Sequence, residues 1–200
     1  MDQLPSFNRA LVEKYDRPGP RYTSYPTAPQ FHQAFAEDDY RAAAARSNQA
    51  QPPKPLSVYI HIPFCKSLCY YCACNKIITH KTERAVEYLE YLKREIAMQG
   101  ALFDRSRKLT QLHLGGGTPT YFTSEQLADL MASLHQAFNM DDSDSHEFSL
   151  EVDPRTVTPE QIHGLRKLGF NRLSFGVQDF DEQVQIAVNR IQTEEQTREL

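Results

Sequence analysis

Residues 58–74 read VYIHIPFCKSLCYYCAC, an apolar stretch followed by all four cysteines of the chain. The cysteines are Cys65, Cys69, Cys72 and Cys74, with the spacing C-x3-C-x2-C-x-C. A disulfide framework normally spreads its cysteines through a small secreted domain, whereas these are crowded into one short segment. We therefore expect this segment to bind a metal ion or an iron–sulfur cluster.

The apolar residues 58–62 predict a strand, so the cysteines follow its C-terminal end, where parallel α/β folds build their sites. Structural zinc usually draws on two separated pairs of ligands, and nothing after Cys74 supplies a second cysteine pair. Three thiolates on one short loop can instead bind three irons of a [4Fe-4S] cluster and leave the fourth iron open to a non-protein ligand. The spacing favours the cluster, and a zinc site and a thiol redox motif remain alternatives.

The composition excludes several classes of protein. The chain has 200 residues, 40% of them hydrophobic and 24% charged, which is typical of a globular protein. A formal net charge of -4 gives no basic field, so we expect no nucleic-acid partner. No apolar run is long enough for a membrane span, and residues 1–5 lack the blocks of a secretory signal. We expect a cytoplasmic protein.

Beyond residue 56, extended and helical patterns alternate. Four βα units in a row predict an α/β fold with a parallel sheet. Apolar residues recur at helical spacing from Ala85 to Ile96 and from Leu127 to Phe138. The expected strands are Ser57–Ile62, Gln111–Leu114, Glu147–Val152 and Arg172–Val177, and the helices that follow them are Glu83–Gly100, Ser124–Phe138, Pro159–Leu168 and one from about Asp181. Thr158 should cap the third helix with Gln161, and Gly169 should end it.

Residues 1–55 are rich in proline and tyrosine and contain one short predicted helix, Asp38–Ala50, which the run QPPKP at 51–55 ends. We expect an irregular N-terminal arm or lid over 1–55 and a core domain over 56–200. The chain stops inside a charged, helix-favouring run, 193–200, without a C-terminal cap signal. We expect a longer protein, with the core domain incomplete at its C-terminus.

Together with the cysteine loop, two further segments of the sequence resemble a known superfamily. YIHIPFC at 59–65, the C-x3-C-x2-C loop and GGGTPT at 115–120 resemble the radical S-adenosylmethionine (SAM) enzymes. The resemblance implies a partial (β/α) barrel, of which this chain holds about four βα units. It also implies that Cys65, Cys69 and Cys72 bind a [4Fe-4S] cluster whose open iron is chelated by SAM.

The glycine triplet alone predicts either a tight turn or a close approach to a ligand, because glycine has no Cβ to clash. The resemblance makes Gly116, Gly117 and Thr118 contacts of the SAM methionine. His61 and His113 alternate with apolar residues on their strands, so we expect packed or hydrogen-bonded histidines and not ligands.

Four further features narrow the resemblance to one family. They are Cys74, PRYTSYPT at 20–27, EVDPR at 151–155 and NRLSFGVQDF at 171–180. These look like the N-terminal portion of the oxygen-independent coproporphyrinogen III oxidases. The resemblance implies oxidative decarboxylation of two propionates of coproporphyrinogen III to vinyl groups, giving protoporphyrinogen IX for haem synthesis. It also implies that the Tyr22–Pro26 arm lies near the active site.

The same family resemblance assigns further site residues. The positions matching Tyr59, Glu151, Gln178 and Arg190 contact SAM, and the one matching Tyr71 borders its adenosine. By residue chemistry alone, Glu151 could be a capped or salt-bridged carboxylate. Cys74 could likewise be a small buried thiol, whereas the family gives it a role in the activity beyond cluster ligation.

The partners that the resemblance implies are coproporphyrinogen III and an electron donor of the flavodoxin or ferredoxin type, with the enzyme a monomer. Three alternatives stay open at this point. A haem-trafficking relative of the same fold would bind haem without decarboxylating it, although such relatives lack the Tyr22 arm and a cysteine matching Cys74. The others are a related haem-degrading radical enzyme and a zinc-stabilised α/β binding module.

Overall fold

The computed structural model describes residues 7–17 and 27–200. The chain forms two compact units, residues 1–40 and 41–200, so the structural division falls before the boundary that we predict at residue 55. The first unit contains α1 (Arg9–Tyr15) and a short 3-10 helix (Ala28–Gln30), and α2 (Glu37–Asn48) begins in it. The helix expected over 38–50 is therefore confirmed, whereas the Tyr22–Pro26 arm lies outside the described residues.

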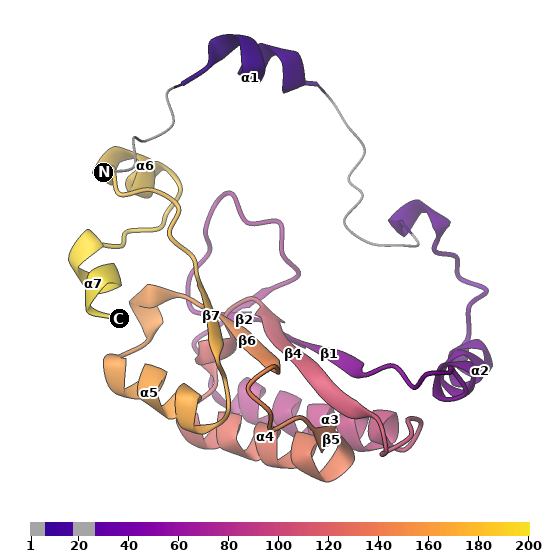
Figure 1. Ribbon diagram of the computed structural model, residues 1–200. Coiled ribbons are helices and arrows are strands. Elements are labelled where there is room, and N and C mark those ends of the chain that lie inside the picture. The colour runs from indigo at the N-terminus through magenta and orange to yellow at the C-terminus, as the bar shows by residue number, and fades with distance from the viewer. Residues whose placement is uncertain (1–6, 18–26) are drawn as a thin grey trace. The chain divides into compact units, whose positions relative to one another are not determined.

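The second unit is built on a parallel sheet. Its strand order is β1 (Leu56–Ile62), β4 (Lys108–Gly116), β6 (Glu147–Val152) and β7 (Arg172–Phe175), and all neighbours run parallel (Figure 1). A short strand, β5 (Asn139–Met140), pairs with the start of β4. The α/β class and the four βα units are confirmed, although β4 is longer than predicted and β7 ends at Phe175.

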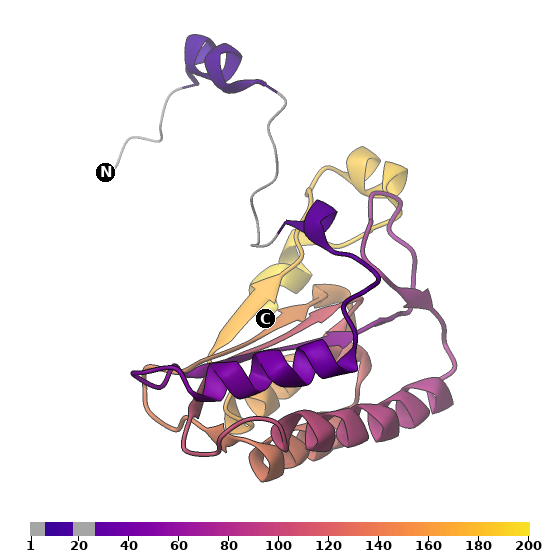
Figure 2. The same cartoon turned by 90° about the vertical axis from the view of Figure 1, so that its right-hand side faces the viewer.

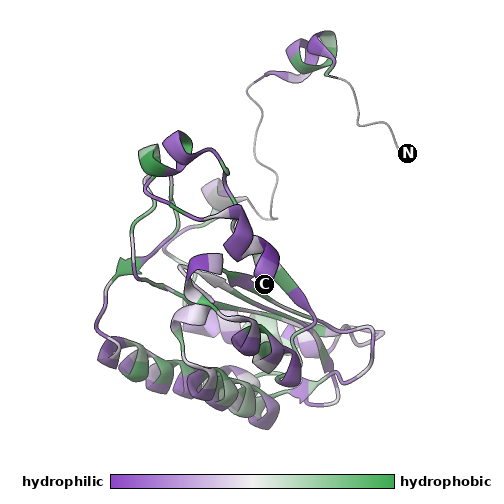
Figure 3. Ribbon diagram, turned by 90° about the vertical axis from the view of Figure 1, so that its left-hand side faces the viewer, coloured by the Kyte–Doolittle hydropathy of each residue, from purple (hydrophilic) through white to green (hydrophobic). Residues whose placement is uncertain are grey.

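Three helices cover one face of this sheet, α3 (Glu83–Gly100), α4 (Ser124–Ala137) and α5 (Pro159–Lys167) (Figures 1 and 2). They alternate hydrophobic and hydrophilic residues along their length, seen as green and purple in Figure 3. The core between helices and sheet includes Ile62, Leu114, Leu130 and Leu150, each with no measurable exposure. Burying one such side chain contributes about 2 kcal/mol, so this layer holds the sheet that carries the site.

The ends of α5 follow the capping rules that the sequence predicts. Thr158 accepts a hydrogen bond from the Gln161 backbone N–H, and the Gln161 side chain accepts one from the Thr158 backbone N–H. Gly169 lies just past the helix with φ +98°, a left-handed conformation that side chains disfavour. Both predictions are confirmed.

The helix expected from about Asp181 is confirmed as α6 (Glu182–Ala187), for which Asp181 is the N-cap, and a further short helix, α7 (Glu194–Glu199), lies in the helix-favouring run at 193–200. Asn189 has a positive φ of 53°, and the Arg190 backbone N–H donates to the Gln185 carbonyl at 2.8 Å. Asparagine tolerates this left-handed geometry, which closes a helix end. The turn directs the chain from α6 back toward the sheet at Arg190.

The other face of the sheet carries polar side chains in register. Tyr59 pairs with His113, which pairs with Ser149, and Glu151 pairs with Ser174 on β7. Because side chains alternate between faces along a strand, these residues lie opposite the helix-covered core. Within residues 7–17 and 27–200, no helix is both long and apolar enough to cross a membrane.

Candidate active site

The cysteine loop leaves the sheet directly after β1 and is closed at its base. Two short parallel strands, β2 (Phe64–Cys65) and β3 (Ile77–Ile78), pair with each other on either side of the loop. The Ile77 N–H donates to the Pro63 carbonyl at 2.7 Å, and the Thr79 N–H donates to the Cys65 carbonyl at 3.0 Å. Strands of two residues are too short for a periodic signal, so the sequence did not predict them.

The turn after α6 fastens the outer part of the same loop. The Tyr70 backbone N–H donates to the Val188 carbonyl at 3.0 Å, and the Asn189 side-chain amide donates to the Leu68 carbonyl at 2.7 Å. Cys69, which lies between the two anchored residues, is buried at 9% exposure. The loop is therefore held at both its base and its tip.

A cavity of about 430 Å³ opens between this loop and the C-terminal ends of the strands. Every predicted site residue except Tyr59 lines it: the four cysteines, Tyr71, the segment Gly116–Thr118, Glu151, Gln178 and Arg190. All four cysteines are free thiols. Their convergence with the strand ends on one cavity is the arrangement expected of a ligand site in a parallel α/β fold.

The glycine turn at the end of β4 passes very close to the start of the cysteine loop. The Gly117 N–H donates to the Ile62 carbonyl and the Thr118 N–H to the Phe64 carbonyl, each at 2.9 Å. The Thr118 hydroxyl lies 3.5 Å from the Cys65 sulfur. Gly116 has φ +120°, which L side chains rarely adopt. The glycines therefore let this turn join the cysteine loop to the sheet.

Replacing Gly117 by alanine should destabilise the protein by about 2 kcal/mol, the usual cost of forcing an extra carbon into packed structure. A Cβ there would lie 2.7 Å from the Pro63 carbonyl oxygen and 2.8 Å from that of Phe64, and backbone atoms cannot rotate away. Thermal unfolding measures the loss.

Gly164→Ala is the matched control, because nothing lies within 4 Å of a Cβ at that position in α5. It should leave stability unchanged or raise it by about 0.5 kcal/mol, since alanine favours helix over glycine. A Gly117→Ala protein that melts with the wild type would show that the turn does not constrain the loop.

Glu151 lies near the end of β6, and its carboxylate contacts two residues of β4, Gly116 and His113. Its Oε2 accepts a hydrogen bond from the Gly116 N–H at 3.2 Å, and its Oε1 lies 3.8 Å from His113 Nε2. His113 in turn pairs its Nδ1 with the Ser149 hydroxyl at 2.8 Å. The Glu151 carboxylate therefore has a hydrogen-bond donor, which an ionised group at a strand end needs. About half of the Glu151 side chain remains exposed, and the residue lines the cavity.

Tyr59 lies outside the cavity lining, on the same polar face. Its hydroxyl lies 2.9 Å from His61 Nδ1, and its ring stacks on His113 with centroids 5.8 Å apart. Burial and the nearby Glu151 carboxylate raise the pKa of the Tyr59 phenol, so it stays protonated. His61 also bonds the Asn75 carbonyl at 2.8 Å, so both histidines are hydrogen-bonded, as expected.

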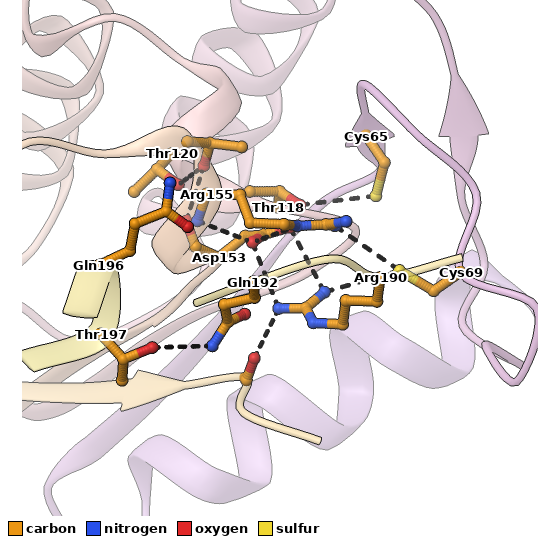
Figure 4. A network of polar contacts seen from close by, with 12 residues as sticks. Cys65, Cys69, Thr118, Thr120, Asp153, Arg155, Arg190, Gln192, Gln196 and Thr197 are labelled. Carbon is orange, nitrogen blue, oxygen red and sulfur yellow. Dashed lines mark hydrogen bonds and ion pairs between the residues drawn. The ribbon is translucent and has the colours of Figure 1, made fainter. Parts of the chain in front are cut away.

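The Asp153 carboxylate and the guanidinium groups of Arg155 and Arg190 form an ion network beside Cys69 (Figure 4). Asp153 accepts from Arg155 at 2.6 Å and lies 3.2 Å from Arg190. Burial raises the pKa of Asp153, but the hydrogen bonds from Arg155 and the charge of Arg190 bring it below its usual value. The carboxylate is therefore ionised at neutral pH.

Arg190 reaches this network from the turn after α6. It is 8% exposed and donates to the Gly176 carbonyl at 2.6 Å. A Cβ at Gly176 would lie 2.9 Å from its guanidinium nitrogen, so glycine leaves the room that the side chain needs. Among the described residues its buried Nε has no hydrogen-bond partner. A buried donor without a partner on a cavity wall is suited to a bound anionic group.

Sequence reasoning assigned no role to Asp153 and Arg155, although both line the cavity. The available signal was the Asp-Pro-Arg run directly after the buried strand β6, where two opposite charges meet at a strand end. Arg155 lies in a short 3-10 helix, Pro154–Thr156, of which Asp153 is the N-cap, and pairing with Asp153 raises the pKa of Arg155.

A family model described as the radical SAM superfamily matches residues 59–200. The chain belongs to the radical SAM superfamily. The matched region runs from β1 through the cysteine loop to the last strand and the turn at Arg190, and so includes every residue of the cavity. Membership of this superfamily replaces the alternative interpretation of the chain as a zinc-stabilised α/β binding module.

Similar proteins of this superfamily carry one name. "Oxygen-independent coproporphyrinogen III oxidase" of Pseudomonas aeruginosa is 50% identical over 188 residues, 94% of this chain and 40% of that protein. The protein of the same name from Escherichia coli is 50% identical over 96% of this chain and 41% of its own length. A third, from Mannheimia haemolytica, is 50% identical over 72% of this chain and 94% of that sequence.

The fold agrees with a solved structure. Coproporphyrinogen III oxidase (HemN) from Escherichia coli, described as a radical SAM enzyme, matches with a TM-score of 0.83 and 46% identity, over 98% of this chain and 42% of that one. The partial parallel-sheet fold of radical SAM type is thereby confirmed. The chain spans about two fifths of the length of the first two relatives named above.

The donor set fits the groups that this superfamily uses. In the described part of the chain, no three histidine, cysteine or acidic side chains converge tightly enough to hold one metal ion. A cluster needs no such convergence, because each thiolate binds a different iron. The cavity supplies four thiols, a glycine turn that a Cβ would obstruct, and the unpartnered donor of Arg190.

Proposed function

We propose that the chain performs the radical SAM oxidative decarboxylation of coproporphyrinogen III, in which two propionate side chains become vinyl groups and protoporphyrinogen IX is formed. The observation that carries this proposal is that four cysteines, the glycine turn, the buried Arg190 and the partly buried Arg155 all line one cavity. The name shared by relatives at 50% identity supports the substrate. Because this chain spans about 40% of those relatives, activity is assigned to the complete natural protein.

In this proposal Cys65, Cys69 and Cys72 hold a [4Fe-4S] cluster through their thiolates. The three lie on the loop that β2, β3 and the turn after α6 fasten, so these contacts hold the segment that carries all three thiols. When bound, the cluster and SAM supply the electron and the 5'-deoxyadenosyl radical that removes hydrogen from a propionate. The fixed loop keeps that radical chemistry beside the strand ends.

SAM would occupy the remaining cavity. Gly116, Gly117 and Thr118 would contact its methionine part, since the turn presents backbone groups without side chains in the way. Glu151 suits the positively charged amino group, and the free Nε of Arg190 suits the carboxylate.

The other assigned contacts complete the same site. Gln178 follows β7 on the cavity wall, and Tyr71 would border the adenosine from the cysteine loop. Tyr59 lies outside the cavity lining, and it would contact SAM from the polar face of the sheet. The chain thus orients SAM and restricts the access of water to a reactive site.

A low-potential electron donor of the flavodoxin or ferredoxin type would reduce the site, in the cytoplasm, with the enzyme acting as a monomer. The N-terminal segment, residues 1–55, would act as an arm or lid. The similar proteins reported above are named as oxidases, so no observation favours the haem-trafficking or haem-degrading alternatives.

Anaerobic reconstitution of the complete natural protein with iron and sulfide tests the proposal. We expect about four irons per chain, as the cluster requires. We also expect an electron paramagnetic resonance spectrum that shifts on adding SAM, 5'-deoxyadenosine formation, and conversion of coproporphyrinogen III. Zinc in place of iron would overturn the mechanism, and a cluster that cleaves SAM without converting coproporphyrinogen III would overturn the substrate.

A further inference from the structure

The Asp153 network contacts the Cys69 sulfur with both of its cations. The Arg155 Nη2 lies 3.6 Å from the Cys69 Sγ, and the Arg190 Nη1 lies 3.5 Å from the same atom (Figure 4). Hydrogen bonds to sulfur are longer than those to oxygen, so both distances are within reach. Two guanidinium groups and one carboxylate give the network a net charge of +1 beside this buried thiol.

The two arginines are not equivalent. Arg190 also donates to the Gly176 carbonyl, and its unpartnered Nε belongs to the SAM site proposed above. Within residues 7–17 and 27–200, the Arg155 side chain instead donates hydrogen bonds only to Asp153 and Cys69. Its Nη2 carries two hydrogens, so one can point at the carboxylate while the other points at the sulfur.

Asp153 fixes this orientation of Arg155. The Arg155 Nε lies 2.9 Å from one carboxylate oxygen and the Nη2 lies 2.6 Å from the other, a two-point contact that suits the planar guanidinium. Only 18% of the Arg155 side chain and 10% of the Asp153 side chain are exposed. Reduced access of water strengthens a charge interaction, so the positive charge acts strongly on the sulfur.

We propose that Arg155, oriented by Asp153, is a positioning residue that donates a hydrogen bond to the cluster sulfur of Cys69 and makes the bound cluster easier to reduce. Hydrogen bonds to cluster sulfurs and nearby charge set the reduction potential of iron–sulfur centres. The Thr118 hydroxyl near Cys65 offers a second, neutral hydrogen bond of this kind. The inference rests on the proposed function, because it requires the cluster.

The reduction step transfers one electron. A low-potential protein donor gives up the electron and the cluster gains it, with no bond to the protein formed or broken and no proton required. The cluster becomes more negative by one charge. A fixed cation beside Cys69 therefore stabilises the reduced state more than the oxidised state, and it raises the potential.

The test is the midpoint potential of the reconstituted, complete natural protein, measured with dithionite as the reductant. Arg155→Met keeps much of the side-chain volume and removes the charge, so its potential should shift to more negative values. Arg155→Lys keeps the charge but loses the planar fork, so its shift should be smaller. Arg166→Met is the matched control, because Arg166 is an exposed arginine of α5 outside this network, and its potential should equal that of the wild type.

Each outcome separates this inference from the proposed function. Wild-type iron content and SAM cleavage test the function, whereas the variant potentials test Arg155. An Arg155→Met protein with full iron content and an unchanged potential would overturn the inference and leave the function intact. Loss of the iron in both Arg155 variants, with the fold retained by circular dichroism, would also overturn it, because the inference gives Arg155 no part in holding iron.

Discussion

Cys69→Ser should reduce cluster assembly and the cleavage of SAM to background levels. Cys69 is the middle cysteine of the loop, it is 9% exposed, and the loop is anchored on both of its sides. A serine hydroxyl is a far poorer iron ligand than a thiolate, and two remaining thiolates cannot hold a site-differentiated cluster. The substitution also removes the sulfur that both guanidinium groups face. Iron content after anaerobic reconstitution and the yield of 5'-deoxyadenosine measure the two losses.

Cys74→Ser is the matched control for this experiment, since it makes the same atomic change two residues past Cys72. It should retain about four irons per chain, because three cysteines suffice for the cluster. A Cys69→Ser protein that still assembles the cluster and cleaves SAM would contradict the assignment of ligands. Cys74 would then be the first candidate for the missing ligand.

The order of strands and helices could be predicted from local signals. Apolar periodicity located α3 and α4, and the capping pattern at Thr158 and Gly169 located both ends of α5. These signals are local because each depends on residues within one or two helical turns. The sequence also located the start of α6 near Asp181, whereas the left-handed turn at Asn189 that follows this helix was not predicted.

Part of the candidate site could be predicted from residue types and their spacing, and not from the periodicity that located the helices. Cysteine spacing and the glycine triplet indicate chemistry by themselves, and the structure brings them to one cavity. The contacts of Arg155 and Arg190 with Cys69 could not be predicted, because they join residues 86 and 121 positions apart in the chain. Such contacts follow from the packing of strand ends and turns, and not from any local pattern.

Cys74→Ser should also abolish most of the decarboxylation while the cluster and SAM cleavage persist. Cys74 is largely exposed and lines the cavity. Its partial burial raises the pKa of its thiol, and the neighbouring Cys72 thiol and Glu151 carboxylate raise this pKa further. A cluster held by three thiolates and SAM has no open iron for a fourth thiolate, so the cavity-facing position of Cys74 suits a role toward the substrate. We expect turnover to fall by roughly 100-fold, the lower end of what losing a directly acting side chain costs.

Formation of 5'-deoxyadenosine by the same variant is the internal control for this loss. If SAM cleavage continues while protoporphyrinogen IX no longer accumulates, the defect lies after the radical forms, and it belongs to the substrate step. Equal turnover in Cys74→Ser and the wild type would remove the role that we give this thiol. Parallel loss of iron would instead place Cys74 among the ligands, so iron content must be measured on the same sample as turnover.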